Sequence, residues 1–198
     1  MSTLLKPFSV RSELLKRNLR VFTPREFARL FRTTSDQSKY FLEESTKRGL
    51  FLRLKRGLYA VRDALPPEEE IANLLYRPSY ISFEYALAFY HILPEMVYTV
   101  TSATTKPTRT FTVASKTFSY LTIKKEAFAG YSPTQREGRT ILIADPEKAV
   151  ADYFYFVALG KKAINERLNL SALDKKKITE YVKLFQRPKL EQLLHDAL

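Results

Sequence analysis

The chain has 198 residues, of which 45% are apolar and 27% are charged, and it carries a formal net charge of +12. It contains no cysteine, which excludes disulfides and thiolate metal sites and favours a reducing cytoplasm. No apolar run approaches membrane-spanning length, and the first residues, MSTLLKPFSVRSELL, lack the apolar stretch of a secretion signal, so we expect a cytoplasmic protein with no membrane partner.

The positive charge is concentrated near the N-terminus. The first 65 residues hold 15 lysines and arginines against 6 acidic residues, a surplus of nine out of the total of twelve. Cations gathered in one part of a chain are typical of a protein that binds the phosphates of nucleic acid. The alternative is a generic solvated basic face, which an even distribution of charge would fit better.

Two helices are predicted before residue 33. Apolar residues at helical spacing predict the first between Ser9 and Leu19. The second lies in VFTPREFARLF, where Thr23 is a good N-cap, Pro24 occupies the first helical position and Glu26 completes a capping box. Arg32 and the two threonines after it end this helix.

A third helix follows almost at once. Thr34 is its predicted N-cap, with Gln37 in the capping-box position, and Gly49 marks its end. On this helix Phe41, Leu42 and Ser45 share one face and are expected to pack inward.

A basic hairpin comes directly after the third helix. FLRLKRGLYAV, residues 51–61, has two apolar-rich strands around a basic tip. Three helices followed by such a hairpin predict a winged helix-turn-helix, with the third helix in the DNA major groove and the hairpin, or wing, against the backbone or minor groove. The predicted DNA-contacting residues are Thr34, Ser35, Gln37, Lys39 and Tyr40 on the third helix, and Arg53, Lys55 and Arg56 on the wing.

These residues have different expected roles. Gln37 can read adenine through two hydrogen bonds, and Lys39 can contact guanine or a phosphate. The alternative for both is plain solvent exposure, and the alternative for Tyr40 is a place in the core. The wing cations are expected to meet phosphates, which adds affinity without reading sequence.

The composition changes after Ala64. The stretch LPPEEE combines a stiff proline pair with the acid-rich first turn of a helix from Glu68 to Tyr76. We therefore predict two domains, residues 1–65 and residues 66–198.

The second domain is predicted to be α+β, with a small, largely antiparallel sheet covered by helices. Strand-forming residues dominate VYTVTSA, RTFTVA, TFSYLTI and TILIA. Ser82 is the predicted cap of the helix FEYALAFYHI, and Asp145 with Pro146 opens the helix DPEKAVADYFYFVAL. Two further helices are predicted, one from Ser171 and one near Pro188.

Several of these stretches resemble a known family. YISFEYALAFYHILPE, TVTSATTKPTRTF and ADPEKAVADYFYF resemble the core of AbiEi-type antitoxins, the antitoxin halves of type IV (AbiE) toxin–antitoxin pairs, and RLKRGLYAV resembles their wing. The resemblance covers about residues 10 to 160.

The resemblance implies a function for each domain. The winged helix would repress the antitoxin–toxin operon by binding inverted repeats in its promoter. The C-terminal domain would supply antitoxin activity and assist cooperative binding, with self-association on DNA. The toxin would be nucleotidyltransferase-like and would be antagonised without a stable complex.

No enzyme is predicted, and no catalytic residue, metal or cofactor is expected. The two histidines, His91 and His195, make neither a metal site nor a triad, and the five glycines form no phosphate-binding loop. The glutamates at 68–70 fit a helix start better than a cation site, and helix capping explains Asp145 and Glu147 in DPEKA.

Two alternatives stay open. One is an enzyme that works through scattered carboxylates. The other is a winged-helix transcription factor whose second domain senses a small ligand or docks a protein, unrelated to any toxin.

Overall fold

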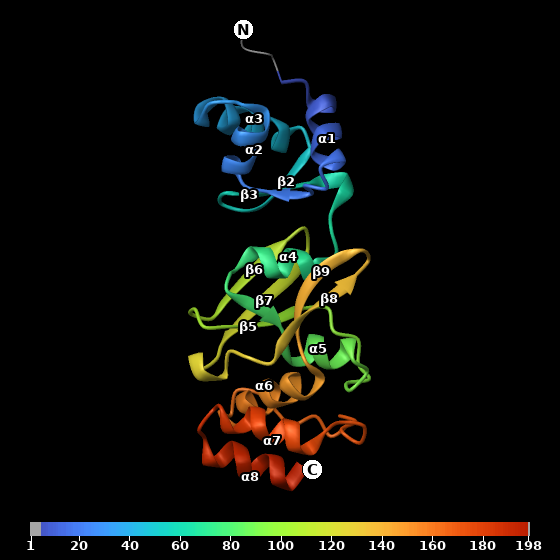
Figure 1. Ribbon diagram of the computed structural model, residues 1–198, viewed down its shortest axis with the longest axis vertical. Coiled ribbons are helices and arrows are strands. Elements are labelled where there is room, and N and C mark those ends of the chain that lie inside the picture. Colours follow the sequence, from blue (N-terminus) through green and yellow to red (C-terminus); the bar gives the residue numbers. More distant parts are fainter. Residues whose placement is uncertain (1–4, 198) are drawn as a thin grey trace. The chain divides into compact units, whose positions relative to one another are not determined.

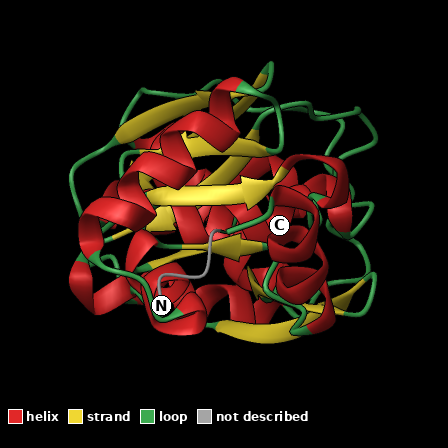
Figure 2. Cartoon of the chain, turned by 90° about the horizontal axis from the view of Figure 1, so that it is seen from above, coloured by secondary structure: helices red, strands yellow, loops and turns green. Residues whose placement is uncertain are grey.

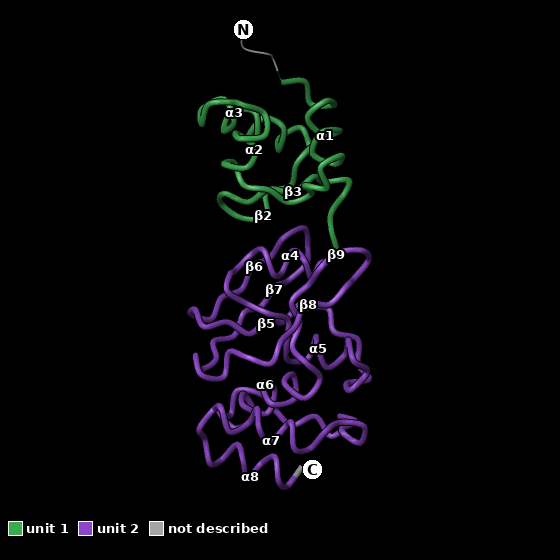
Figure 3. The backbone as a smooth tube through the Cα atoms, in the orientation of Figure 1, with its two compact units in different colours: residues 1–67 green, residues 68–198 purple. Residues whose placement is uncertain are grey.

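The computed structural model describes residues 5–197, which divide into two compact units. Unit 1 extends to Pro67 and unit 2 begins at Glu68 (Figure 3). Figure 2 shows the helices and strands of the chain; both kinds of element occur in each unit, so the predicted α+β class is confirmed. Within the described residues, no helix is both long and apolar enough to cross a lipid bilayer.

The described part of unit 1, residues 5–67, forms three helices and three short strands (Figure 1). In chain order they are α1 (Pro7–Lys16), β1 (Val21–Phe22), α2 (Pro24–Phe31), α3 (Ser35–Lys47), β2 (Phe51–Lys55) and β3 (Leu58–Val61), followed by a 3₁₀ turn, η1 (Arg62–Ala64). Both predicted capping boxes are confirmed, at Thr23 with Glu26 and at Thr34 with Gln37. Between these helices Arg32 adopts a left-handed conformation, with φ of 51°, which turns the chain from α2 into α3.

The three strands form an antiparallel sheet in the order β1-β3-β2. Its apolar side packs with the helices around one aromatic cluster. Phe22 and Phe51 meet edge to face, with ring centroids 5.2 Å apart, and Phe27 stacks on Phe41 at 5.6 Å. The buried members of this core are Val10, Leu14, Phe22, Phe27, Leu42, Phe51, Tyr59 and Val61.

Unit 2 contains one six-stranded sheet and five helices among its described residues. The helices are α4 (Glu68–Leu75), α5 (Phe83–Phe89), α6 (Pro146–Ala158), α7 (Lys175–Lys183) and α8 (Pro188–Ala197), with a 3₁₀ turn, η2 (Lys125–Ala127). The strands are β4 (Ser79–Ile81), β5 (Val100–Thr104), β6 (Arg109–Val113), β7 (Lys116–Thr122), β8 (Tyr131–Arg136) and β9 (Arg139–Ala144).

The sheet order is β6-β7-β5-β4-β9-β8, and the sheet is mixed rather than largely antiparallel. The pairs β5–β7 and β4–β9 are parallel, and the other three neighbours are antiparallel. The prediction of a largely antiparallel sheet did not include the two parallel pairs, because parallel pairing depends on which strands become neighbours rather than on the residues of any one strand.

Helices cover both faces of the sheet. Tyr80 donates its hydroxyl hydrogen bond to Asp152 of α6, whereas Tyr120 donates to the carbonyl of Ala72 in α4. Residues directly paired across strands point to the same face, and the register places Tyr80 and Tyr120 on opposite faces. Helices α4 and α6 therefore lie on opposite sides of the sheet.

Two predicted helix caps proved wrong in their chemistry. Ser82 and Asp145 both occupy N-cap positions, but neither side chain bonds the helix that follows it. Ser82 donates to Asp152, and the amide of Tyr85 is instead bonded by the hydroxyl of Thr101 in β5. Tertiary partners thus take the side chains that local pattern assigned to caps.

One of the two C-terminal helices differs from prediction, whereas α8 begins at Pro188 as predicted. Helix α7 begins at Lys175 rather than Ser171, because Asp174 caps it by accepting from the amides of Lys176 and Lys177. Asp145 accepts a 2.8 Å hydrogen bond from Tyr181 of α7. Helix α7 is therefore bound to the start of α6 through polar contacts.

Candidate functional site

The residues predicted to contact DNA from α3 are all exposed. They are Thr34, Ser35, Gln37, Lys39 and Tyr40. The ring of Tyr40 is 72% exposed, which excludes the alternative that it belongs to the core. The opposite face of α3 is buried through Leu42, Ser45 and the unpredicted Ser38.

Gln37 has a structural role that limits what it can read. Its side-chain oxygen accepts a hydrogen bond from the backbone amide of Thr34 at 3.1 Å, and its backbone amide donates to the Thr34 hydroxyl at 3.2 Å. Reading adenine through two hydrogen bonds needs both the oxygen and the nitrogen of the side-chain amide. With the capping box in place, the oxygen is already occupied.

The exposed surface of α3 is not basic. Asp36, Glu43 and Glu44 outnumber Lys39 and Lys47 on this helix. Lys47 forms an ion pair with Glu44 at 2.7 Å, and this hydrogen bond lowers the pKa of the carboxyl. A helix of this composition cannot attract phosphates by itself, so any electrostatic attraction to DNA must come from the segments around it.

One such segment is the β2–β3 hairpin. Arg53 and Arg56 are exposed, Lys55 is half-buried, and Gly57 turns the tip with φ of 78°. In Figure 1 the hairpin tip lies on the same side of unit 1 as α2 and α3, away from α1. The predicted hairpin cations therefore face the solvent beside the two helices.

Helix α2 and the turn after it contain three more exposed cations, which the sequence did not predict as DNA contacts. Arg25 and Arg29, at i and i+4, lie on one side of α2, and Phe27 is buried on another. Arg32 lies in the turn that follows the helix. No described carboxylate lies within ion-pair distance of these three arginines. The helical spacing of Arg25 and Arg29 was the signal in the sequence that could have identified them.

Two further carboxylates of unit 1 form local ion pairs. Glu13 pairs with Arg17, and Asp63 pairs with Arg11 at 2.7 Å. These hydrogen bonds lower the pKa of both carboxyls below the usual range. With Glu44, three of the six carboxylates of unit 1 are ion-paired, whereas the exposed arginines of α2 and the hairpin have no ion pair among the described residues and add to the field that an approaching anion meets.

Unit 2 contains a fully buried charged cluster. Lys148 and Asp152 lie one turn apart on α6 and form an ion pair. The side chains of both residues are fully buried. Asp152 also accepts from the hydroxyl of Tyr80 at 2.9 Å and from that of Ser82 at 2.7 Å. Burial lowers the pKa of Lys148, against the opposing effect of Asp152, and raises the pKa of Tyr80. No substrate can reach these groups, so the cluster is structural.

The acidic start of α4 is also explained by contacts with the sheet. Glu68 pairs with Lys116, and Glu70 pairs with Arg139 through two hydrogen bonds of 2.5 and 2.7 Å. Glu69 lies 3.5 Å from Arg136. Within residues 5–197, no group of three or more histidine and acidic side chains is placed to hold a metal ion.

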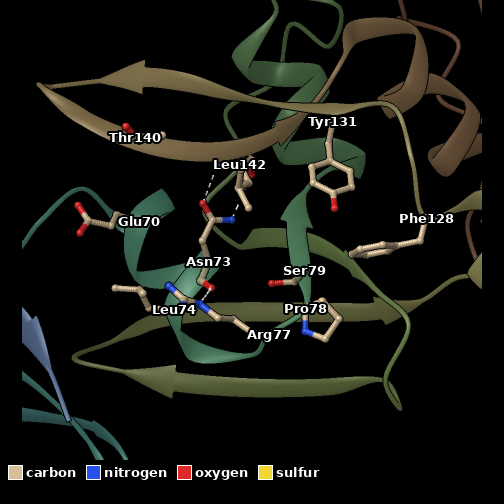
Figure 4. Close-up of a pocket in the computed structure, with 10 residues that line it drawn as sticks. All are labelled: Glu70, Asn73, Leu74, Arg77, Pro78, Ser79, Phe128, Tyr131, Thr140 and Leu142. Carbon is tan, nitrogen blue, oxygen red and sulfur yellow. Dashed lines mark hydrogen bonds between the residues drawn. The ribbon is translucent and has the colours of Figure 1, made fainter. Parts of the chain in front are cut away.

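A pocket of about 650 Å³ lies where β4 and β9 separate. The two strands pair only at Ile81 and Ile143. At the neighbouring residue of β9, the side chain of Asn73 bonds the backbone groups of Leu142. Its side-chain nitrogen donates to the carbonyl of Leu142 at 3.1 Å, and its oxygen accepts from the Leu142 amide at 2.7 Å (Figure 4). The lining residues are Glu70, Asn73, Leu74, Arg77, Pro78, Ser79, Phe128, Tyr131, Thr140 and Leu142.

No protein-family model matches the chain, and no curated protein matches it significantly. The function is therefore argued from the residues and contacts described above.

Proposed function

We propose that unit 1 is a winged helix-turn-helix that binds double-stranded DNA and that the protein represses its own promoter at inverted repeats. The observation that carries this proposal is the set of exposed arginines without described carboxylate partners on α2 and on the β2–β3 hairpin, the elements that precede and follow α3 in the chain. Such a field favours association with a polyanion, because cations that neutralise phosphates release the counterions of DNA.

The roles divide between the elements. In a helix-turn-helix the first helix of the motif crosses the DNA backbone and the second enters the major groove. Arg25 and Arg29 of α2 would contact phosphates together with Arg56 of the hairpin. Lys39 and Tyr40, which project from α3, would reach the base edges and supply sequence preference.

The antitoxin part of the proposal rests on the resemblance of three stretches of unit 2 to AbiEi-type antitoxins. In this proposal the protein antagonises a nucleotidyltransferase-like toxin without forming a stable complex, and unit 2 provides both the antitoxin activity and the self-association that makes DNA binding cooperative. The buried cluster of Lys148, Asp152, Tyr80 and Ser82 joins two of the stretches that carry the resemblance.

DNA binding is tested by fluorescence anisotropy on the protein's own promoter and on a scrambled duplex across a series of salt concentrations. Arg25→Gln and Arg56→Gln should each weaken binding to both duplexes and reduce the salt slope by about 0.9. Arg109→Gln, which removes an exposed cation of unit 2, is the matched control and should leave the slope unchanged. Binding that ignores salt, or that does not prefer the promoter, counts against the proposal.

The antitoxin role is tested by growth rescue against the product of the neighbouring gene, which we expect to be a nucleotidyltransferase-like protein. The double variant Arg53→Gln/Arg56→Gln should lose repression and keep rescue, because unit 2 is unchanged. Rescue that disappears with repression would show that neutralisation acts through the promoter alone. A neighbouring gene of a different kind removes the basis of the antitoxin proposal.

The pocket beside Asn73 favours a second candidate function. In this alternative the protein is a winged-helix transcription factor whose unit 2 senses a small ligand, with no connection to a toxin. Promoter binding that changes with a small molecule, in a protein that gives no growth rescue, would favour it over the first.

A further inference from the structure

The pocket of unit 2 carries a single uncompensated positive charge. Its one acidic lining residue, Glu70, is neutralised by the two hydrogen bonds from Arg139. Arg77 bonds only the carbonyl of Asn73, through Nε at 3.3 Å, and no described carboxylate pairs with it. The terminal nitrogens of Arg77 are therefore able to bind an anionic group.

A second polar group at the pocket has no partner. Ser79 is 5% exposed, and its hydroxyl oxygen is buried without a hydrogen bond. An unsatisfied buried hydroxyl costs about 1–3 kcal/mol, so its presence in a pocket wall calls for an explanation. In Figure 4 the Ser79 hydroxyl points toward Asn73 and away from Tyr131, and rotation about its Cβ–Oγ bond changes the direction in which it donates.

The opposite wall of the pocket is aromatic and held firmly. The ring of Tyr131 stacks on the buried ring of Tyr80, with centroids 4.5 Å apart and an angle of 12° between the planes. Phe128 packs against both rings, at 5.3 Å from Tyr131 and 5.1 Å from Tyr80. A ring fixed in this way offers an apolar surface on which a planar ligand can stack without ordering a mobile side chain.

We propose that this pocket binds a small ligand composed of a planar ring and an anionic group. The ring would lie against Tyr131 and Phe128, and the carboxylate or phosphate would be held by Arg77 and Ser79. The pocket volume of about 650 Å³ falls within the range of about 300–1,000 Å³ that is typical of small-molecule sites. This proposal depends only on unit 2 and stands apart from DNA binding by unit 1.

The test is a titration of the full-length, ¹⁵N-labelled protein followed by amide NMR shifts. Adenosine monophosphate and benzoate are the two probes that combine a ring with an anion, and they separate a phosphate source from a carboxylate source. We expect at least one to bind with a Kd below about 1 mM and to shift amides of residues 73–79 and 128–142. Adenosine and inorganic phosphate, which each lack one part, should bind at least about tenfold more weakly.

Variants assign the contacts. Arg77→Gln should weaken binding of the anionic probe at least about tenfold, and Tyr131→Ala should weaken it through loss of the stacking surface. Tyr131→Phe keeps the ring and should retain most of the affinity. Arg109→Gln is the control for net charge and should bind as the wild-type chain does, with unchanged NMR spectra showing that each variant is folded.

Three outcomes overturn the proposal. Neither probe binds with a Kd below about 1 mM, or the probe binds Arg77→Gln as well as it binds the wild-type chain. Alternatively, the shifts fall only on the arginines of α2 and the hairpin, which would mean that the anion binds the basic surface of unit 1. None of these outcomes involves DNA, so they are distinct from a failure of the repressor proposal.

Discussion

Replacing Lys148 by methionine tests the reading of the buried cluster in unit 2. The substitution keeps the length of the side chain and its packing against Phe185, whose ring centroid lies 4.8 Å from the ammonium nitrogen. What it removes is the positive charge beside Asp152. The carboxylate is then left in a site without solvent exposure, with only the hydroxyls of Tyr80 and Ser82 as donors.

The size of the effect follows from these contacts. Removing one partner of a buried ion pair costs about 3–5 kcal/mol. The two remaining hydrogen bonds to the carboxylate place Lys148→Met toward the lower end, about 3 kcal/mol. An upper bound of about 4 kcal/mol comes from the cost of protonating an ordinary aspartate at pH 7, which would relieve the unpaired charge.

The assay is a double-mutant cycle with Asp152→Asn, which keeps an oxygen acceptor for the hydroxyls and leaves the lysine unpaired. Urea unfolding of the full chain, followed by NMR signals of Ile143 and Val150, reports on unit 2. Each single variant should be destabilised strongly, and the double variant by much less than the sum. Lys47→Met, at an exposed ion pair, is the control and should change the stability of unit 1 little.

The reasoning is refuted if Lys148→Met lowers the free energy of unfolding by less than about 1 kcal/mol. Additive effects in the cycle would refute it equally, because they would show that the two charges do not stabilise one another.

Three further outcomes are expected. Gln37→Ala removes the side-chain acceptor of the capping box, so the thermal midpoint should fall while the ratio of promoter to scrambled-duplex affinity stays unchanged in competition binding. A lower ratio at an unchanged midpoint would contradict the capping role. Burial raises the pKa of Tyr80 above that of an unfolded tyrosine, near 10. The contribution of the buried, protonated Tyr80 to the free energy of unfolding is therefore complete below about pH 10 and is lost as the pH rises further. Tyrosinate absorbance and circular dichroism should therefore change together in alkali, and early ionisation of all the tyrosines without unfolding would contradict this. Gly130→Ala would place a Cβ 2.5 Å from Cε1 of Tyr181, whereas Gly138→Ala, also at positive φ, meets open space. Urea unfolding should show a larger loss for the first, and equal losses would mean that backbone strain alone decides.

Local chemistry predicted the capping contacts of α2 and α3 in unit 1, but in unit 2 it placed the starts of α5 and α6 without predicting the partners of Ser82 and Asp145. The capping partners of Thr23 and Thr34 are three residues further along the chain, so both partners of each hydrogen bond lie within one short sequence motif. Ser82 carries the same signal, but its partner Asp152 lies 70 residues further along the chain. A buried acceptor outcompetes a local amide, and no local pattern records where that acceptor will be.

The sheet shows the same limit. The edge strand β8 has the sequence YSPTQR, which is mostly exposed and contains Pro133, so neither alternation nor β-propensity predicted it. An edge position tolerates the proline, because a strand there needs only one paired side. The parallel pairs could not be predicted, since they depend on which strands become neighbours rather than on any strand's own residues.

The candidate sites divide in the same way. The hairpin cations and the exposed N-terminal end of α3 were predicted from the order of helices and hairpin, because these elements are adjacent in the chain. The pocket is assembled from residues 70–79, 128–131 and 140–142. Only the sheet order brings these three segments together, so no motif in the sequence marked it.

The sheet order also determines what is exposed while the chain is being synthesised. Strand β4 leaves the ribosome first and can pair with β5, and then β7 and β6 extend the sheet on that side. The edge of β4 that faces away from β5 stays unpaired until β9 is synthesised, because Ile81 of β4 pairs with Ile143 of β9. During that interval an apolar edge of the nascent chain is available to other chains. Slow translation between residues 105 and 139 should therefore lower the yield of folded protein more than the same delay placed after Ala144.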